Sequence, residues 1–331
     1  MKIAVIGGTG LIGKKLVNKL TGMGHEVVAG SPATGINTIT GEGIDAALSG
    51  ASVVVDVTNP PLFKGESALE FFETSGNNLL AAAIRAGVKH HVVLSVVGTE
   101  GLQDSAYFRA KLAQENLVRQ SGIPFTIIHS TQFFEFVGAI ARSGLQGEVI
   151  RMSPAFIQPI ASDDVVAAMA DIIAGDPVNG MVDIAGPEKF RLDELVRKYL
   201  LVMKDEHEVI TDEQALYFGT TLNDGSLVPG EGTRTGAVYY TNIVLINSQK
   251  AANWAYQQIN GSLILNNTQV QKGTVNVAVI NAGGQVVTSR SFNHSGGAFN
   301  QVMQLPVSAK GIYTVKINSE NQNTVFRILI Q

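Results

Sequence analysis

Three side chains near the middle of the chain have the types and the spacing for proton transfer. Tyr107 and Lys111 stand four residues apart, so a helix would place both on one face. Ser95 precedes Tyr107 by twelve residues, at the end of an apolar run. A carbonyl that accepts a hydride develops negative charge on its oxygen and needs a proton donor with stabilising neighbours. Tyr107 could be the proton donor, a Lys111 ammonium would lower the tyrosine pKa, and Ser95 would hydrogen-bond the substrate oxygen. The alternative is that Tyr107 is a surface tyrosine and Lys111 a solvated lysine.

Closely spaced glycines follow the first apolar run. Lys2 to Ile6 leads into Gly7-Gly8-Thr9-Gly10-Leu11-Ile12-Gly13, and a helical stretch comes next. In this context the first glycine permits a tight turn, the second lets backbone approach a pyrophosphate, and the third lets helix and strand pack closely. The helix N-terminus adds unpaired N–H groups and a positive dipole. The pattern predicts a dinucleotide site, and the alternative is a structural turn that binds nothing.

The residues after the second apolar run bear on which dinucleotide is preferred. An acid there would bind the adenosine ribose hydroxyls, and an arginine would favour a 2′-phosphate. Gly30, Ser31 and Pro32 occupy this place. Without an acid the usual discrimination against a 2′-phosphate is missing, and Ser31 can donate a hydrogen bond to one. The sequence therefore favours NADP(H) slightly over NAD(H) and leaves both open.

Apolar runs alternate with helical periods over the first part of the chain. Runs rich in Val and Ile, typical of strands buried on both faces, cover residues 2–6, 26–29, 52–57, 91–95 and 125–129. Helices are expected near residues 11–23, 66–86, 107–121, 162–174 and 190–202. This alternation predicts an α/β fold, a Rossmann-like doubly wound parallel sheet. Ser95, Tyr107 and Lys111 would then lie at its carboxyl edge, where such sheets bind ligands.

Residues 244–331 differ in composition from the rest of the chain. They carry six basic and one acidic side chain, whereas residues 1–243 carry 18 basic and 27 acidic ones. Apolar residues alternate along three of their runs: Val275, Val277 and Val279, then Tyr313, Val315 and Ile317, then Phe326, Ile328 and Ile330. Such alternation predicts a small antiparallel β-sandwich. We therefore expect two domains, residues 1–243 and residues 244–331.

Composition excludes several classes of function. A formal charge of -4 gives no attraction to nucleic acid or anionic lipid, and no apolar stretch reaches the roughly 18 residues of a membrane span. The absence of cysteine excludes thiolate metal ligands, and the pair His90-His91 has no third ligand, so no metal site is expected. With no secretory signal at its start, the protein is expected to be cytoplasmic and to act on a small molecule. The oligomeric state is left open.

The motifs of about residues 1–240 together resemble the atypical, NmrA-like branch of the short-chain dehydrogenase/reductase superfamily, whose members bind NAD(P)H. Besides the glycine loop, the likeness rests on residues 56–60, 90–98, 107–115 and 131–136. The resemblance implies a pyrophosphate site made by Gly7, Thr9, Gly10, Leu11, Ile12 and Gly13. It also implies that Val57, Thr58 and Asn59 line the adenosine side, that Lys111 meets the nicotinamide ribose, and that the substrate side is formed by Thr131, Gln132 and Phe133.

Two functions fit these residues. Because Ser95, Tyr107 and Lys111 are all present, we expect an NAD(P)H-dependent reductase of a small carbonyl or quinone compound, with Tyr107 as the proton donor. The alternative is a non-catalytic NAD(P)-binding redox sensor of the NmrA type. Turnover that is lost in Tyr107→Phe while cofactor binding is kept would distinguish the two.

The tail resembles the carboxyl-terminal sorting domain of type IX secretion cargo. The likeness rests on residues 279–287, 311–316 and 325–330. It implies export, and with it a third class of function, adhesion or display at the cell surface. The lack of a signal at the start of the chain argues against that class.

Overall fold

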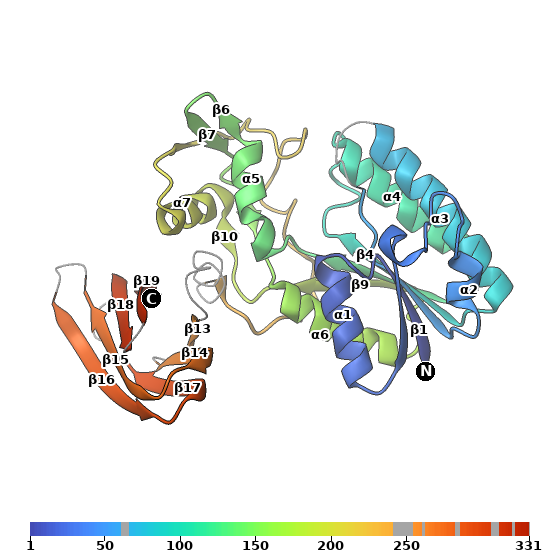
Figure 1. Cartoon of the computed structure of the whole chain (residues 1–331). Coiled ribbons are helices and arrows are strands. Elements are labelled where there is room, and N and C mark those ends of the chain that lie inside the picture. The colour runs from blue at the N-terminus through green and yellow to red at the C-terminus, as the bar shows by residue number, and fades with distance from the viewer. Residues whose placement is uncertain are drawn as a thin grey trace. The chain divides into compact units, whose positions relative to one another are not determined.

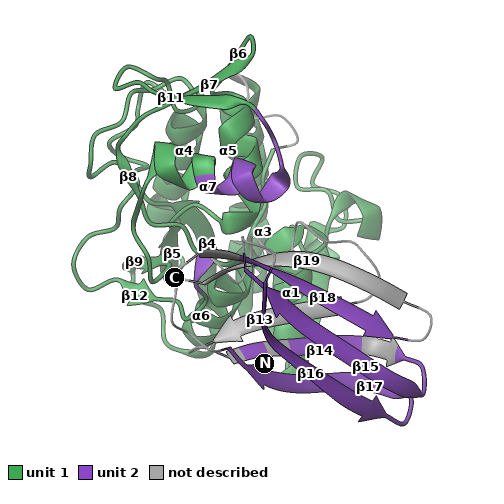
Figure 2. Ribbon diagram, turned by 90° about the vertical axis from the view of Figure 1, so that its left-hand side faces the viewer, with its two compact units in different colours: residues 1–197, 207–238 green, residues 198–206, 239–331 purple. Residues whose placement is uncertain are grey.

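The computed structural model describes residues 1–60, 66–240, 254–259, 262–281, 285–305, 311–319 and 322–330 (Figure 1). These residues form two compact units (Figure 2), Met1–Arg197 with His207–Val238, and Lys198–Glu206 with Tyr239–Gln331. The expected boundary at residue 243 lies outside the described residues. Within the described ranges, no helix combines the length and the apolar character that crossing a bilayer requires.

A seven-stranded parallel sheet forms the centre of the first unit. Its strand order is β12-β9-β5-β4-β3-β1-β2, and every neighbouring pair runs parallel. The strands are β1 (Lys2–Ile6), β2 (Glu26–Gly30), β3 (Val53–Asp56), β4 (His90–Val96), β5 (Phe125–Ser130), β9 (Gly180–Ala185) and β12 (Arg234–Thr235). The central strands are buried on both faces, so the predicted Rossmann-like fold is confirmed.

Helices cover both faces of this sheet (Figure 1). On one face α1 (Leu11–Gly22) and α6 (Ser162–Ala174) bury Leu16 and Met169 against Val55 of β3. On the other face α2 (Ile44–Leu48), α3 (Glu66–Ala86) and α4 (Ala106–Gln120) pack against Val54 and Val93. All four helices predicted in this part begin and end within one residue of the expected bounds.

Shorter elements complete the first unit. The strands β11 (Glu208–Thr211), β7 (Val149–Met152) and β6 (Leu145–Gln146) form one small sheet, and β8 (Phe156–Ile157) pairs with β10 (Phe190–Arg191). The helix α5 (Val137–Ser143) precedes them, and the 3-10 turns η1 (Pro32–Thr34) and η2 (Phe134–Phe136) lie earlier. The helix α7 (Leu192–Met203) follows β10 and is shared, since its residues up to Arg197 belong to the first unit and residues 198–203 to the second. The sequence predicted only α7 among these, because strands of two to four residues are too short to show a period.

The second unit contains two antiparallel sheets. One is β13 (Trp254–Ile259), β14 (Ser262–Val270) and β17 (Gly297–Gln304), and the other is β16 (Val286–His294), β15 (Gly273–Ile280), β18 (Gly311–Ser319) and β19 (Gln322–Ile330). Leu263 and Phe299 of the first sheet share one buried apolar cluster with Val277 and Val315 of the second, as in a β-sandwich. The alternation expected around these two valines is confirmed. The side chains of residues 326, 328 and 330 lie outside those described.

Candidate functional site

Close backbone packing shapes the loop between β1 and α1. Gly7 has a φ of +86°, and a Cβ there would lie 2.8 Å from the carbonyl carbon of Val57. Gly13 is tighter still, since its Cβ would lie 2.1 Å from the Gly7 oxygen. Gly10, the N-cap of α1, contributes no capping side chain, and Thr9 and Leu11 beside it are exposed. Among the described residues, no side chain caps the backbone N–H groups at the start of α1. Such N–H groups at a helix N-terminus can bind an anion such as a pyrophosphate.

Ser31 follows β2 and caps η1. Its backbone N–H donates to Thr34 Oγ1 at 2.9 Å, and the two hydroxyl oxygens lie 3.5 Å apart. The Ser31 side chain is buried. The hydroxyl expected to meet a 2′-phosphate therefore already has a neighbour within its own turn.

Asp56 organises the end of β3. Its Oδ1 accepts hydrogen bonds from the N–H of Thr58 at 2.9 Å and from the Thr58 hydroxyl at 2.7 Å, and its Oδ2 accepts from Gln114 Nε2 at 2.8 Å. The N–H of Val57 donates to the carbonyl of Ile6 in β1. The segment of residues 57–59 is thereby fixed beside the glycine loop, at the same edge of the sheet.

Tyr107 and Lys111 share one face of α4, as predicted. The half-buried Tyr107 donates its hydroxyl to Asn59 Oδ1 at 3.4 Å. Lys111 Nζ donates to the carbonyl of Leu94 at 2.8 Å and to Gln114 Oε1. Burial lowers the pKa of Lys111 to about 8, although nearby carboxylates oppose that shift. Burial also raises the pKa of Tyr107, so the lowering expected from Lys111 is not found.

Ser95 belongs to a different cluster. Its hydroxyl donates to Glu115 Oε1 at 2.5 Å, His129 Nε2 lies 3.0 Å from the same oxygen, and Arg119 donates to Glu115 Oε2 at 2.9 Å. Burial favours the neutral acid, but the contacts with His129, Ser95 and Arg119 outweigh it and lower the pKa of Glu115. Glu115 lies eight residues beyond Tyr107 on α4, roughly 12 Å along the helix. The structure therefore brings Asn59 to Tyr107 and pairs the Ser95 hydroxyl with Glu115.

The residues after β5 present unpaired polar groups. Gln132 is 8% exposed, and neither atom of its side-chain amide has a hydrogen-bond partner within the described part of the chain. The Thr131 hydroxyl is buried and unpartnered in the same sense. Phe133 stacks on Phe136 with ring centroids 5.5 Å apart. Because buried polar groups are normally paired, these atoms fit a ligand with its own amide, such as the nicotinamide end of a dinucleotide.

A loop that the sequence did not single out carries a buried tyrosine, Tyr217. Tyr217 is 5% exposed and begins a two-residue turn closed by hydrogen bonds with Thr220. Burial, and after it the neighbouring Tyr107, raise the pKa of Tyr217. Farther along, the loop packs on the end of β4, where a Cβ at Gly98 would lie 2.4 Å from the Ser226 oxygen. In the sequence, Tyr217 is marked only by its place in the segment Tyr217-Phe218-Gly219.

His90 and His91 are buried in β4. Burial lowers the pKa of His91 to about 4 and lowers that of His90 as well, so both rings are neutral near pH 7. His90 Nε2 lies 2.8 Å from the Thr126 hydroxyl. No group of three metal-binding side chains occurs among the residues that the structure describes. The His90 contact links β4 to β5.

Two curated proteins are similar to this chain. A protein of Streptomyces griseus named (4-alkanoyl-5-oxo-2,5-dihydrofuran-3-yl)methyl phosphate reductase is 28% identical over 203 residues, which cover 56% of this chain and 68% of that protein. The photosystem II assembly factor Ycf39 of Synechocystis is 23% identical over 149 residues, 41% of this chain and 46% of the factor. The alignment thus covers less than half of the factor's length.

Solved structures share the fold. An NADPH-dependent quinone oxidoreductase of Escherichia coli, in complex with NADPH, is 21% identical with a TM-score of 0.50, covering 63% of this chain and 77% of that one. A UDP-glucose 4-epimerase of Thermus thermophilus in complex with NAD is 18% identical with a TM-score of 0.53, covering 72% and 96%. At these identities the likeness shows the fold alone.

Two family models match this chain, one in each of its two parts. Residues 258–331 match the secretion system C-terminal sorting domain, so the resemblance of the tail is confirmed. Residues 7–175 match the NAD(P)H-binding model, and this match includes the glycine loop, Tyr107 and Lys111. Since the matched residues make up over half of the chain, the protein belongs to the NAD(P)H-binding family.

Proposed function

We propose that the protein is an NAD(P)H-dependent reductase of a small carbonyl or quinone compound, in the NmrA-like branch of the short-chain dehydrogenase/reductase superfamily. The observation that carries the proposal is the Tyr107 phenol, which lies 3.4 Å from Asn59 Oδ1 at the sheet edge that also carries the uncapped glycine loop. Lys111 lies one helical turn behind it. The names of the Streptomyces griseus reductase and the Escherichia coli quinone oxidoreductase support this reaction class.

Tyr107 is the proposed proton donor. A bound nicotinamide would supply the hydride. The Tyr107 hydroxyl is protonated near pH 7, and because burial raises its pKa and makes it a weaker acid, the donor role depends on the Lys111 ammonium to favour release of the proton to the substrate oxygen. Asn59 Oδ1 orients the phenol, and the Lys111 ammonium would stabilise the tyrosinate that remains and bind the cofactor ribose. Ser95 acts in this scheme only through Glu115, which holds α4 against β4 and β5.

We propose NADPH as the preferred cofactor. Gly30, Ser31 and Pro32 place no carboxylate after β2, so nothing in that turn repels a 2′-phosphate. Titration of the purified protein with NADPH and NADH measures the preference directly, and tighter binding of NADH would overturn it.

The reaction is tested by following oxidation of the reduced cofactor with a panel of quinones and aldehydes. We expect Tyr107→Phe to lower kcat by about 100-fold or more, while the dissociation constant of NADPH stays within about twofold. Tyr239→Phe, at an exposed tyrosine, is the matched control and should leave both quantities unchanged. Full activity in Tyr107→Phe would refute the role of the phenol.

The rival function is a non-catalytic NAD(P) sensor. One observation favours it, since the Ser95 hydroxyl is held by Glu115 and the Lys111 ammonium by Leu94 and Gln114. A relative named as an assembly factor is in line with a binding role. Cofactor binding without oxidation by any compound of the panel would support the sensor over the reductase.

We propose residues 1–243 as the reductase domain and residues 244–331 as a separate sorting-type domain. Reduced nicotinamide cofactors are formed in the cytoplasm, so we place the reaction there. The sorting-domain match instead favours export. Fractionation of producing cells, with detection of the intact chain, decides between the two locations.

A further inference from the structure

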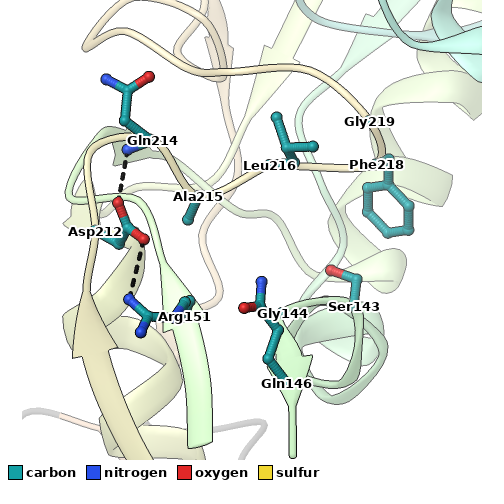
Figure 3. Close-up of a pocket in the computed structure, with 10 residues that line it drawn as sticks. All are labelled: Ser143, Gly144, Gln146, Arg151, Asp212, Gln214, Ala215, Leu216, Phe218 and Gly219. Carbon is teal, nitrogen blue, oxygen red and sulfur yellow. Dashed lines mark hydrogen bonds and ion pairs between the residues drawn. The ribbon is translucent and has the colours of Figure 1, made fainter.

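A pocket of about 740 Å³ lies among α5, β6, β7 and the loop after β11 (Figure 3). Ligand pockets for small molecules range over roughly 300–1,000 Å³. The residues of its wall that matter here are Ser143, Gln146, Arg151, Asp212, Leu216 and Phe218. Neither the glycine loop nor Tyr107 lines it, so the pocket is additional to the site described above.

One wall of the pocket is apolar and exposed. Leu216 is 58% exposed and Phe218 is 41% exposed, and both border the pocket in Figure 3. Phe218 has a φ of +47° and Gly219 a φ of +93°, within the turn that Tyr217 and Thr220 close. The left-handed conformation costs an aromatic residue about 1–2 kcal/mol. The chain therefore tolerates a strained backbone at the point where an exposed phenyl ring borders the pocket.

The facing wall is polar and balanced in charge. Arg151 donates to Asp212 Oδ2 at 3.3 Å, and Asp212 Oδ1 accepts from the N–H of Gln214 at 2.9 Å (Figure 3). Arg151 and Asp212 cancel each other's charge, so they attract no net ionic group. Ser143 and Gln146 add neutral hydrogen-bonding groups. Such a wall suits an uncharged polar group better than a phosphate or a carboxylate.

The turn that bears Phe218 belongs to a loop that continues to the end of β4, where a Cβ at Gly98 would lie 2.4 Å from the Ser226 oxygen. The Tyr217 ring meets the Phe218 ring edge-on at 4.8 Å between centroids. Tyr217 itself is buried, and Tyr107 is close enough to raise its pKa further. The loop thus joins the exposed Phe218 ring at the pocket to the carboxyl end of β4, the strand that precedes α4 and Tyr107.

We infer that this pocket binds the non-reacting part of the substrate, and that the substrate is an uncharged amphipathic carbonyl or quinone compound. Its apolar group packs on Leu216 and Phe218, and a neutral polar group bonds to Arg151 and Asp212. The inference rests on the proposed reductase function. It separates this chain from the Streptomyces griseus relative, whose name specifies a phosphate substrate.

Steady-state kinetics of the full-length protein test the inference. Leu216→Ser and Phe218→Gly remove the apolar wall, and the second change also relieves the backbone strain, so the fold is retained. For quinones with a long alkyl chain we expect KM to rise by about tenfold in each variant, with kcat and NADPH affinity unchanged. Short-chain quinones should show a much smaller change. Ile84→Ser, at an equally exposed apolar side chain of α3, is the matched control, and equal effects in Ile84→Ser and Leu216→Ser would overturn the assignment.

A binding measurement separates failure of the pocket from failure of the reductase. The uncharged fluorescent probe N-phenyl-1-naphthylamine should bind the wild-type protein about tenfold more tightly than it binds Leu216→Ser or Phe218→Gly. If it does while no quinone is reduced, the pocket stands and the proposed reaction falls. Equal affinities in all variants overturn the pocket whatever the activity. Tighter binding of the sulfonate analogue 8-anilinonaphthalene-1-sulfonate than of the neutral probe overturns the uncharged class.

Discussion

Gln132 is a residue at which a binding role can be distinguished from a stabilising one by experiment. Its buried amide has no partner, which costs about 1–3 kcal/mol in the unliganded protein. We expect Gln132→Leu to raise the free energy of unfolding by about 1 kcal/mol and to weaken NADPH binding by about tenfold. Denaturant unfolding and cofactor titration measure the two effects.

Gln158 provides the matched control for this change. Its Nε2 donates to the carbonyl of Gly186 at 2.9 Å, so its side chain is already satisfied. Gln158→Leu should lower stability by about 1 kcal/mol and leave NADPH binding unchanged. A Gln132→Leu protein that loses stability as Gln158→Leu does would contradict a ligand-binding role for Gln132.

Lys111 makes stability depend on pH. Its pKa of about 8 in the folded protein lies below the 10.5 of an unperturbed lysine, so between these values the unfolded chain binds more protons than the folded one. The free energy of unfolding contributed by Lys111 therefore rises with pH from about 8 to 10, by about 3 kcal/mol at most. Lys111→Met should remove this rise. The free energy of unfolding of both proteins is measured by chemical denaturation across this pH range. If it rises equally with pH in the wild-type protein and in Lys111→Met, the rise is not due to Lys111.

At this scale the sequence predicted single residues better than their partners. Tyr107 and Lys111 could be placed on one helix face because a spacing of four residues is visible in the sequence. The contacts of Glu115 with Ser95 and His129 join α4, β4 and β5, and such pairings depend on the register of packing. One signal was present, since Tyr107, Lys111 and Glu115 continue one stripe at four-residue steps.

The turn from β1 into α1 is the element on which we expect cofactor binding to depend most. Gly7→Ala would put a Cβ 2.8 Å from the backbone of Val57 at a left-handed φ, whereas a Cβ at Gly22, the last residue of α1, meets nothing within 4 Å. We expect Gly7→Ala to cost about 3 kcal/mol of stability and to abolish measurable NADPH binding. Gly22→Ala should add up to about 1 kcal/mol and leave binding unchanged. Thermal melts and titrations of both variants check this, and wild-type affinity in Gly7→Ala would remove the loop from the binding site.

Elements with strong periodicity were predictable, and those of the substrate side were not. Buried strands such as β1 and β3 are runs of Val and Ile, so their bounds follow from the apolar residues alone. The strands β6, β7 and β11 have two to four residues each and are specified by pairings distant in sequence. For that reason the pocket beside Arg151 and the turn at Phe218 emerged only from the structure.

Among the residues that the structure describes, the large buried clusters of the two units share no residue. The buried cluster of the sandwich runs from Leu263 to Ile317, whereas the two large clusters of the sheet unit end at Ile127 and Ile184. The two parts of the chain also differ in charge. Residues 1–243 have 18 basic and 27 acidic side chains, a net charge of -9, whereas residues 244–331 have six basic and one acidic side chain, a net charge of +5. Such independence predicts that each unit is stabilised by its own burial.

Removal of residues 244–331 should therefore leave the cofactor site intact. We expect a chain of residues 1–243 to bind NADPH within about twofold of the full-length affinity and to keep its melting temperature within a few degrees, because both large clusters of the sheet unit are retained. Calorimetry of the full-length protein should show two transitions, of which the shortened chain keeps one. An insoluble or cofactor-free product from residues 1–243, with the full-length protein binding normally, would mean that the tail is part of the reductase fold and is not a separable module.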